Sequence, residues 1–180
     1  MTYHSQFCKN KYELALGIPI MPLKGGSGPA PKCDDSTDIV DEAITLFRST
    51  ILFKNFRPEG PADKVIVYLT CFIQKALYDI IRVKNSVDLP KADAIAAVNK
   101  LVAEPIPGPT DQSFFMKQLG LLASGSPAET KKMQEFFKQC KEECAKRLIE
   151  TIYAYDGLDL KYWLQFGRRP FLGQKFNDKI

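Results

Sequence analysis

Cys140 and Cys144 are the first candidates for chemistry, because two cysteines four residues apart share one face of a helix and can bind a metal ion together. A structural zinc site needs four ligands, and the sequence offers no second pair of closely spaced cysteines to complete it. Met133 and Leu148 fall on the same helical face, so the pattern favours packing in a core. We therefore expect no metal and no other cofactor.

Covalent catalysis would need a nucleophile, a base and a group that orients the base. The sole histidine, His4, lies close to the N-terminus, where we expect a mobile chain, and the sequence places no cysteine beside it. There is no Gly-x-Ser-x-Gly motif, and no carboxylate stands in a context that suggests a raised pKa. We predict that the protein is not an enzyme.

Near its C-terminus, in residues 157–180, the chain combines aromatic with basic side chains. Three interpretations fit this composition: the aromatic residues dock the segment onto its own domain, the segment forms a protein interface, or it holds nucleic acid. The net charge of +4 is mild and no nucleic-acid recognition motif is present, which disfavours the third interpretation. Because aromatic residues and arginine are enriched in protein interfaces, we predict a candidate protein interface formed by Trp163, Phe166, Arg168, Arg169 and Phe171.

The elements that carry these residues are expected to be helices. The chain has 180 residues, of which 45% are apolar and 26% charged, as in an ordinary globular domain. We expect an all-α fold, a single compact domain of about five to six helices. An extended N-terminal segment (1–36) precedes a helical core (37–156), and Gly167, Pro170 and Gly173 make the C-terminal segment irregular.

Apolar periodicity and capping residues define the expected helices. The run 61–83 is apolar on almost all sides, but residues such as Lys64 and Gln74 interrupt it, so we predict a buried central helix and no membrane insertion. The full set of expected helices is 37–56, 61–83, 89–103, 112–123 and 126–156.

The composition of two stretches of the N-terminal segment, and the spacing of the cysteines, argue against a secretory signal, a phosphate-binding loop and a disulfide framework. Residues 13–23 could pass for the apolar part of a secretory signal, but Pro19 and Pro22 and the lack of a small-residue cleavage site favour an extended segment lying on the domain. The stretch 24–32 lacks the Gly-Lys-Ser/Thr of a phosphate-binding loop, so we expect it to connect elements. Five cysteines at irregular spacing do not resemble a disulfide framework, which indicates a reducing compartment such as the cytosol.

The two most specific segments of the chain are STDIVDEAI at Ser36–Ile44 and ADKVIVYLTCFI at Ala62–Ile73. They resemble the subunit 3 (21-kDa subunit) family of the actin-related protein 2/3 complex. LFKNF at Leu52–Phe56 and PIPG at Pro105–Gly108 follow in the order of the family, and the region around Trp163 resembles its C-terminus. Where relatives tend to have two adjacent tryptophans, this chain has Tyr-Trp, and residues 84–103 and 110–135 match poorly.

The resemblance implies a non-catalytic, all-α structural subunit of a seven-subunit assembly that nucleates actin filaments as branches. It implies that the chain positions actin-related protein 3, lies near the mother filament and works in the cytoplasm, in the actin-rich cortex and projections. The implied partners are actin-related protein 3, the other subunits and the actin filament, with no nucleic acid and ATP held by the two actin-related subunits. The alternative is a free-standing helical nucleic-acid-binding or adaptor protein.

Overall fold

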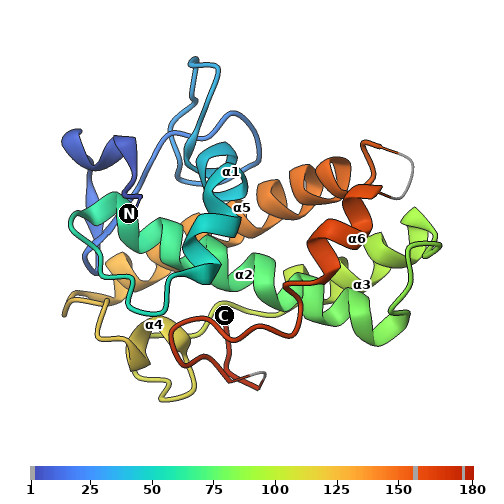
Figure 1. The fold of residues 1–180 in the computed structure, drawn as a ribbon. Coiled ribbons are helices and arrows are strands. Elements are labelled where there is room, and N and C mark those ends of the chain that lie inside the picture. The colour runs from blue at the N-terminus through green and yellow to red at the C-terminus, as the bar shows by residue number, and fades with distance from the viewer. Residues whose placement is uncertain (1–2, 156–157, 176) are drawn as a thin grey trace.

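Residues 3–155, 158–175 and 177–180 are described by a computed structural model of the chain. Figure 1 shows a mostly helical domain, which confirms the predicted all-α class. In chain order the elements are η1 (Gln6–Lys9), β1 (Leu14–Ala15), β2 (Ile18–Pro19), α1 (Ile39–Leu52), α2 (Pro61–Val83), α3 (Lys91–Ala103), α4 (Phe115–Gln118), α5 (Pro127–Ile152) and α6 (Leu158–Leu164).

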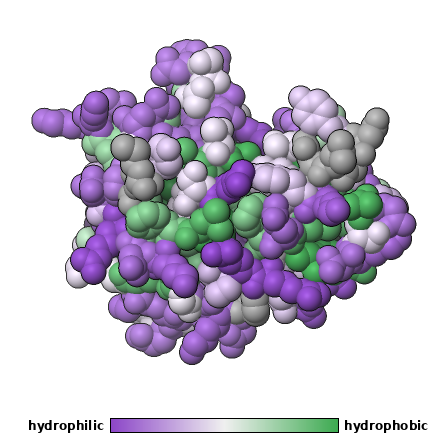
Figure 2. All heavy atoms as spheres, in the orientation of Figure 1, coloured by the Kyte–Doolittle hydropathy of each residue, from purple (hydrophilic) through white to green (hydrophobic). Residues whose placement is uncertain are grey.

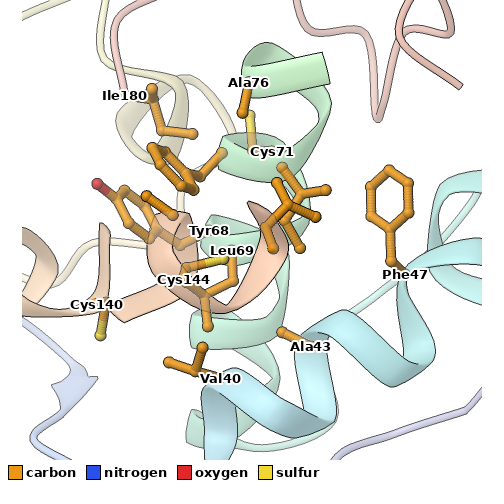
Figure 3. Packing of buried hydrophobic residues seen from close by; sticks show 14 of the residues in the cluster. Val40, Ala43, Phe47, Tyr68, Leu69, Cys71, Ala76, Cys140, Cys144 and Ile180 are labelled. Carbon is orange, nitrogen blue, oxygen red and sulfur yellow. The ribbon is translucent and has the colours of Figure 1, made fainter. Parts of the chain in front are cut away.

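The helix α2 runs through the middle of the domain and contacts α1, α3, α5 and α6 (Figure 1). Pro61 occupies its first turn, where a missing N–H costs nothing. Apolar residues on all its sides are buried, as predicted for a central helix. Figure 3 shows Tyr68 and Cys71 of α2 among side chains from α1 and α5. Among the described residues, no helix is long and apolar enough to cross a membrane.

Two of the helices that pack against α2, α1 and α5, begin with capping boxes. At the start of α1, the Asp38 carboxylate accepts hydrogen bonds from the N–H groups of Val40 and Asp41, and Asp41 bonds back to the Asp38 N–H. Ser126 and Glu129 make the same reciprocal pair at the start of α5. These local bonds satisfy N–H groups that no helical partner reaches, which explains why the beginnings of both helices were predicted accurately.

Helices α2 and α3 end at Val83 and Ala103 as predicted, whereas the ends of α1 and α5 differ from the prediction. Helix α1 ends at Leu52 and not at Phe56. Helix α5 ends at Ile152, and the expected stop at residues 156–157 lies outside the described residues. The hydroxyl of Tyr153, the residue that follows α5, donates to the Leu89 carbonyl oxygen at 2.9 Å. This tertiary bond accompanies the earlier stop, and apolar spacing alone does not reveal it.

The expected helix 112–123 was wrong in length, because α4 is a single turn, Phe115–Gln118. Gly120 follows with a φ of 67°, in the left-handed region that ends a helix. The residue before α4, Phe114, pairs with Lys179 as an isolated bridge, so this part of the chain has a tertiary partner in place of further helical turns.

The N-terminal segment lies on the domain, as expected for an extended segment. Leu16, with a φ of 52°, and Gly17, with a φ of 77°, form the turn of the hairpin β1–β2. Ala15, Leu16 and Ile18 are buried, and β2 packs against α2. The apolar residues of the range 15–23 are therefore part of the domain core.

Candidate protein-interaction surface

The five residues of the predicted interface separate into a buried and an exposed group. Trp163, Phe166 and Phe171 are 7%, 5% and 1% exposed, whereas Arg168 and Arg169 lie on the surface. The aromatic residues therefore dock the C-terminal segment onto its own domain, the first of the three interpretations. A partner could reach the two arginines directly, and the aromatic residues would act by holding them in place.

Phe47 of α1 is the residue against which Trp163 and Phe166 pack. Its ring stacks on Trp163 at 5.5 Å between centroids and meets the edge of Phe166 at 5.8 Å. Aromatic pairs in these geometries contribute about 0.5–1.5 kcal/mol each beyond the area that they bury. Tyr162 lies partly outside this cluster, with its ring against those of Trp163 and Phe166.

Gly167 brings the chain after α6 into close contact with α2. A Cβ at this position would overlap Cδ1 of Ile81 and approach the carbonyl oxygen of Leu77 to 3.0 Å. The Gly167 carbonyl oxygen accepts a buried hydrogen bond from Nε2 of Gln74 at 2.9 Å. The lack of a side chain therefore allows the backbone to lie directly on α2. This contact holds the backbone of the segment just before the exposed Arg168.

The last residues of the chain are also tied to the core. The Lys179 N–H donates to the Ser113 carbonyl oxygen at 2.9 Å, and its carbonyl oxygen accepts from the Phe115 N–H at 3.1 Å. The side chain of Lys75 donates to the carbonyl oxygen of Asp178. Ile180 is buried, and Figure 3 places it near Tyr68 and Cys71. The expectation of an irregular segment is right for the backbone after α6, but that backbone is held in place.

A groove lies beside Arg168, between α6 and the C-terminal end of α2 with the loop that follows it. Its volume is about 510 Å³. We call it the α2–α6 groove; it is lined by Ile81, Asn85, Ser86, Val87, Lys161, Leu164, Gln165 and Arg168. The prediction missed the contribution of residues 85–87. The signal in the sequence was Val87, an apolar residue between two predicted helices. In the structure its side chain is 49% exposed.

A larger groove, of about 820 Å³, lies between α1, α5 and α6. In its wall the Arg48 guanidinium sits over the Tyr162 ring, 5.9 Å from the centroid. Arg147 of α5 is bonded to three carboxylates, at 2.6 Å to Asp38, 3.2 Å to Asp41 and 2.7 Å to Glu143. Three of the charged residues that line this groove, Lys24, Asp41 and Arg147, are thus held in ion pairs within the chain.

The pKa values of Asp38, at the N-terminal end of α1, and of Arg147 on α5 reflect the hydrogen bonds of this ion-pair network. Burial alone would raise the pKa of Asp38, but hydrogen bonds from Arg147 and from the N–H groups of Lys24 and Asp41 outweigh it and hold the pKa below its usual value. Burial alone would lower the pKa of Arg147, but its hydrogen bonds to Asp38 and Glu143 raise that pKa above its usual value. Both groups are therefore charged across the physiological range.

The structure places Cys140 and Cys144 in the core, where both are fully buried (Figure 3). Burial raises the pKa of both thiols, which keeps them protonated and inert at neutral pH. The described part of the chain contains no group of three or more His, Cys, Asp or Glu residues placed to hold a metal ion. These observations support the interpretation of the cysteine pair as core packing.

The expectation for His4 was wrong, because its ring is bonded to the domain. Nδ1 lies 2.7 Å from the buried Asp63 carboxylate and Nε2 lies 3.2 Å from Glu59. Cys8 lies close to Asp63, and burial raises the pKa of its thiol, opposite to what a nucleophile needs. The cluster therefore ties the N-terminal segment to the start of α2.

One carboxylate contradicts the expectation that none has a raised pKa. The pKa of Asp79 on α2 lies above its usual value, chiefly because the side chain is half-buried, although the nearby Lys75 opposes the shift. A raised carboxylate pKa is one property of a general acid, but the described structure places no nucleophile with an oriented base beside it.

Comparison with known proteins identifies similar chains. The model of the family P21-Arc, described as the ARP2/3 complex ARPC3 (21 kDa) subunit, matches residues 1–176. The chain is 39% identical to actin-related protein 2/3 complex subunit 3 of Arabidopsis thaliana, over 96% of this chain and 97% of the relative. Identity to the protein of the same name in Dictyostelium discoideum is 36%, over 97% of this chain and 99% of the relative. For the protein of the same name in Schizosaccharomyces pombe the identity is 34%, over 96% of this chain and 97% of the relative.

Proposed function

The chain belongs to the family of the ARP2/3 complex ARPC3 (21 kDa) subunit, and on that premise we propose that it is a non-catalytic structural subunit of this complex. In this role it contributes to actin filament nucleation and to the assembly of branched networks. The observation that carries the proposal is the match along nearly the whole chain, at up to 39% identity to the relatives named above.

The mechanism that we propose is positioning. A helix buried on all sides and a C-terminal segment tied to it make a rigid body, and a rigid body can hold a neighbour in one orientation without chemistry of its own. We propose that the neighbour is actin-related protein 3 and that the chain lies near the mother filament. The other subunits and the actin filament complete its partners, in the cytoplasm at the actin cytoskeleton.

The C-terminal segment supplies the proposed contact to a partner. Arg168 and Arg169 are exposed, and the buried aromatic residues beside them hold the backbone of the segment in place. Binding a partner therefore orders the arginine side chains without the further cost of ordering the backbone. Trp163, Phe166 and Phe171 belong to this interface as the residues that fix its shape.

The native mass of the full chain in a cell extract tests the proposal. We expect the chain to elute with an assembly that contains two actin-like proteins, and to be absent from the fractions of a 20-kDa monomer. Elution as a lone monomer would contradict the proposal. A free chain that binds RNA or DNA with a steep dependence on salt would favour the nucleic-acid-binding alternative.

A further inference from the structure

The α2–α6 groove has a charge pattern that distinguishes it from the neighbouring grooves. Its lining includes two cations, Lys161 and Arg168, and no acidic residue. The groove between α1, α5 and α6 includes Asp41 and Glu150 among its lining residues, and the groove between α3 and α5 includes Glu142 and Glu150. Among these three grooves, only the α2–α6 groove has a lining that carries cations and no acidic residue.

The two cations of the groove are free of ion pairs with any carboxylate that the structure describes. The nearby loop carboxylate, Asp88, is already engaged by Lys84 at 2.9 Å and by the Ser86 hydroxyl. These bonds hold the pKa of Asp88 at about 2, so it stays a charged acceptor for its own loop. Lys161 and Arg168 are thus available to groups outside this chain.

The rest of the lining is apolar or neutral. Ile81 and Leu164, 7% and 8% exposed, line the groove, and Val87 beside them is 49% exposed. In the orientation of Figure 1, Figure 2 shows hydrophobic residues among hydrophilic ones at this end of the molecule.

From this pattern we propose that the α2–α6 groove binds a carboxylate-bearing segment of a neighbouring protein subunit, with an aspartate or glutamate between Lys161 and Arg168 and an apolar side chain against Val87 and Leu164. Charge complementarity selects the acid, and the exposed apolar surface selects a protein over a nucleic acid, whose phosphate backbone would gain nothing from it. The proposal rests on the proposed function, because it names a surface through which the subunit contacts its assembly.

Carbodiimide cross-linking of the native complex tests the contact directly. The reagent joins a lysine amine to a carboxylate with loss of water and adds no spacer, so it reports only groups that touch. We expect mass spectrometry to find Lys161 linked to an aspartate or glutamate of another subunit. In a Lys161→Arg complex, the cross-link disappears while assembly stays the same, since arginine keeps the charge and lacks the amine.

Charge reversal tests the energetic importance of the same groove. We expect the full-length double variant Lys161→Glu, Arg168→Glu to be recovered with the complex about tenfold less than the wild-type chain. The matched control, Lys54→Glu with Arg57→Glu, makes the same change of charge at two exposed residues between α1 and α2 and should assemble normally. Thermal unfolding of each chain shows that any loss is not a loss of folding.

The outcomes separate the two proposals. If the wild-type chain assembles, but Lys161 forms no cross-link to another subunit and the charge-reversed chain assembles normally, the groove proposal is wrong and the proposed function stands. If the charge-reversed chain instead loses RNA binding that the wild-type chain shows, the occupant is a nucleic acid and the groove proposal is also wrong. A wild-type chain that elutes alone overturns both.

Discussion

At the scale of single residues, burial decides which polar groups matter. Lys141 is fully buried within α5, yet its ammonium group donates to the carbonyl oxygens of Leu101 at 3.1 Å and Glu104 at 2.8 Å. These carbonyls lie at the C-terminal end of α3, where helical partners are lacking and positive charge is favoured. A lysine on one helix thus caps another, far away in the sequence.

The pKa of Lys141 gives the first prediction. Burial lowers this pKa from 10.5 to about 8, against the attraction of Glu104. Between these values the unfolded chain binds more protons than the folded chain, so the contribution of Lys141 to the unfolding free energy rises with pH. We expect the stability of the wild type relative to Lys141→Met to increase by about 1–3 kcal/mol from pH 7 to pH 10.5.

Urea denaturation of both chains at several pH values measures this difference. The cysteines and tyrosines that ionise in the same range are common to both chains, so their effects cancel. If the difference in unfolding free energy between the two chains stays constant with pH, the pKa of Lys141 is not lowered by folding and the prediction is wrong. At pH 7, loss of the two hydrogen bonds is partly offset because methionine brings no charge into the core.

At the scale of elements, the contact of the C-terminal segment with α2 depends on Gly167. Alanine at this position would place a methyl group against Ile81 and the Leu77 backbone, and backbone cannot give way as a side-chain tip can. The displaced segment would also weaken the buried bond between Gln74 and the Gly167 carbonyl oxygen. Helix α6, the segment after it and α2 therefore behave as one packed unit.

We predict that Gly167→Ala lowers the unfolding free energy by about 2 kcal/mol, within the range for overpacked core sites. Gly108→Ala is the matched control, since the nearest atom to its added Cβ is Nε2 of Gln134 at 4.0 Å. Thermal unfolding of the two variants measures the effect. Equal stabilities would mean that the segment can move away from α2 at little cost.

At the scale of the whole molecule, the C-terminal segment completes the core. Its apolar side chains belong to the same hydrophobic cluster as residues of α1, α2 and α5, and Figure 3 shows Ile180 as one member of that cluster. The buried members that it adds are Leu160, Trp163, Leu164, Phe166, Phe171 and Ile180. A helical domain that lost them would expose the apolar residues beneath, among them Phe47 of α1.

We therefore predict that deletion of residues 158–180 abolishes the cooperative unfolding transition, because each buried large apolar side chain contributes about 1.5–3 kcal/mol and a domain is stable by only about 5–15 kcal/mol. Near-ultraviolet circular dichroism during heating measures the transition. The control is the full chain with Arg168→Ala and Arg169→Ala, which removes only exposed side chains and should change stability by less than about 0.5 kcal/mol. A truncated chain that still unfolds cooperatively would contradict the prediction.

The sequence alone determined what is local or periodic. Capping boxes at Asp38 and Ser126 fixed where two helices begin, because their bonds join residues three apart. An apolar run without a polar face identified α2 as the central helix, and the family resemblance followed from the same segments. The aromatic and basic residues of the C-terminal segment were visible too, as a composition that fitted either docking or an interface.

Only the tertiary structure decided which of these side chains are buried on the domain and which stay exposed, because burial depends on what meets a side chain across the fold. Contact with Phe47 buries Trp163 and Phe166 and leaves the arginines outside. Helix α4 has a single turn, and the residue before it pairs with the distant Lys179. The α2–α6 groove forms where the loop that contains Val87 meets α6, which is also distant in the sequence. Periodicity carries no information about such distant contacts, since it reports only how one segment divides its own faces.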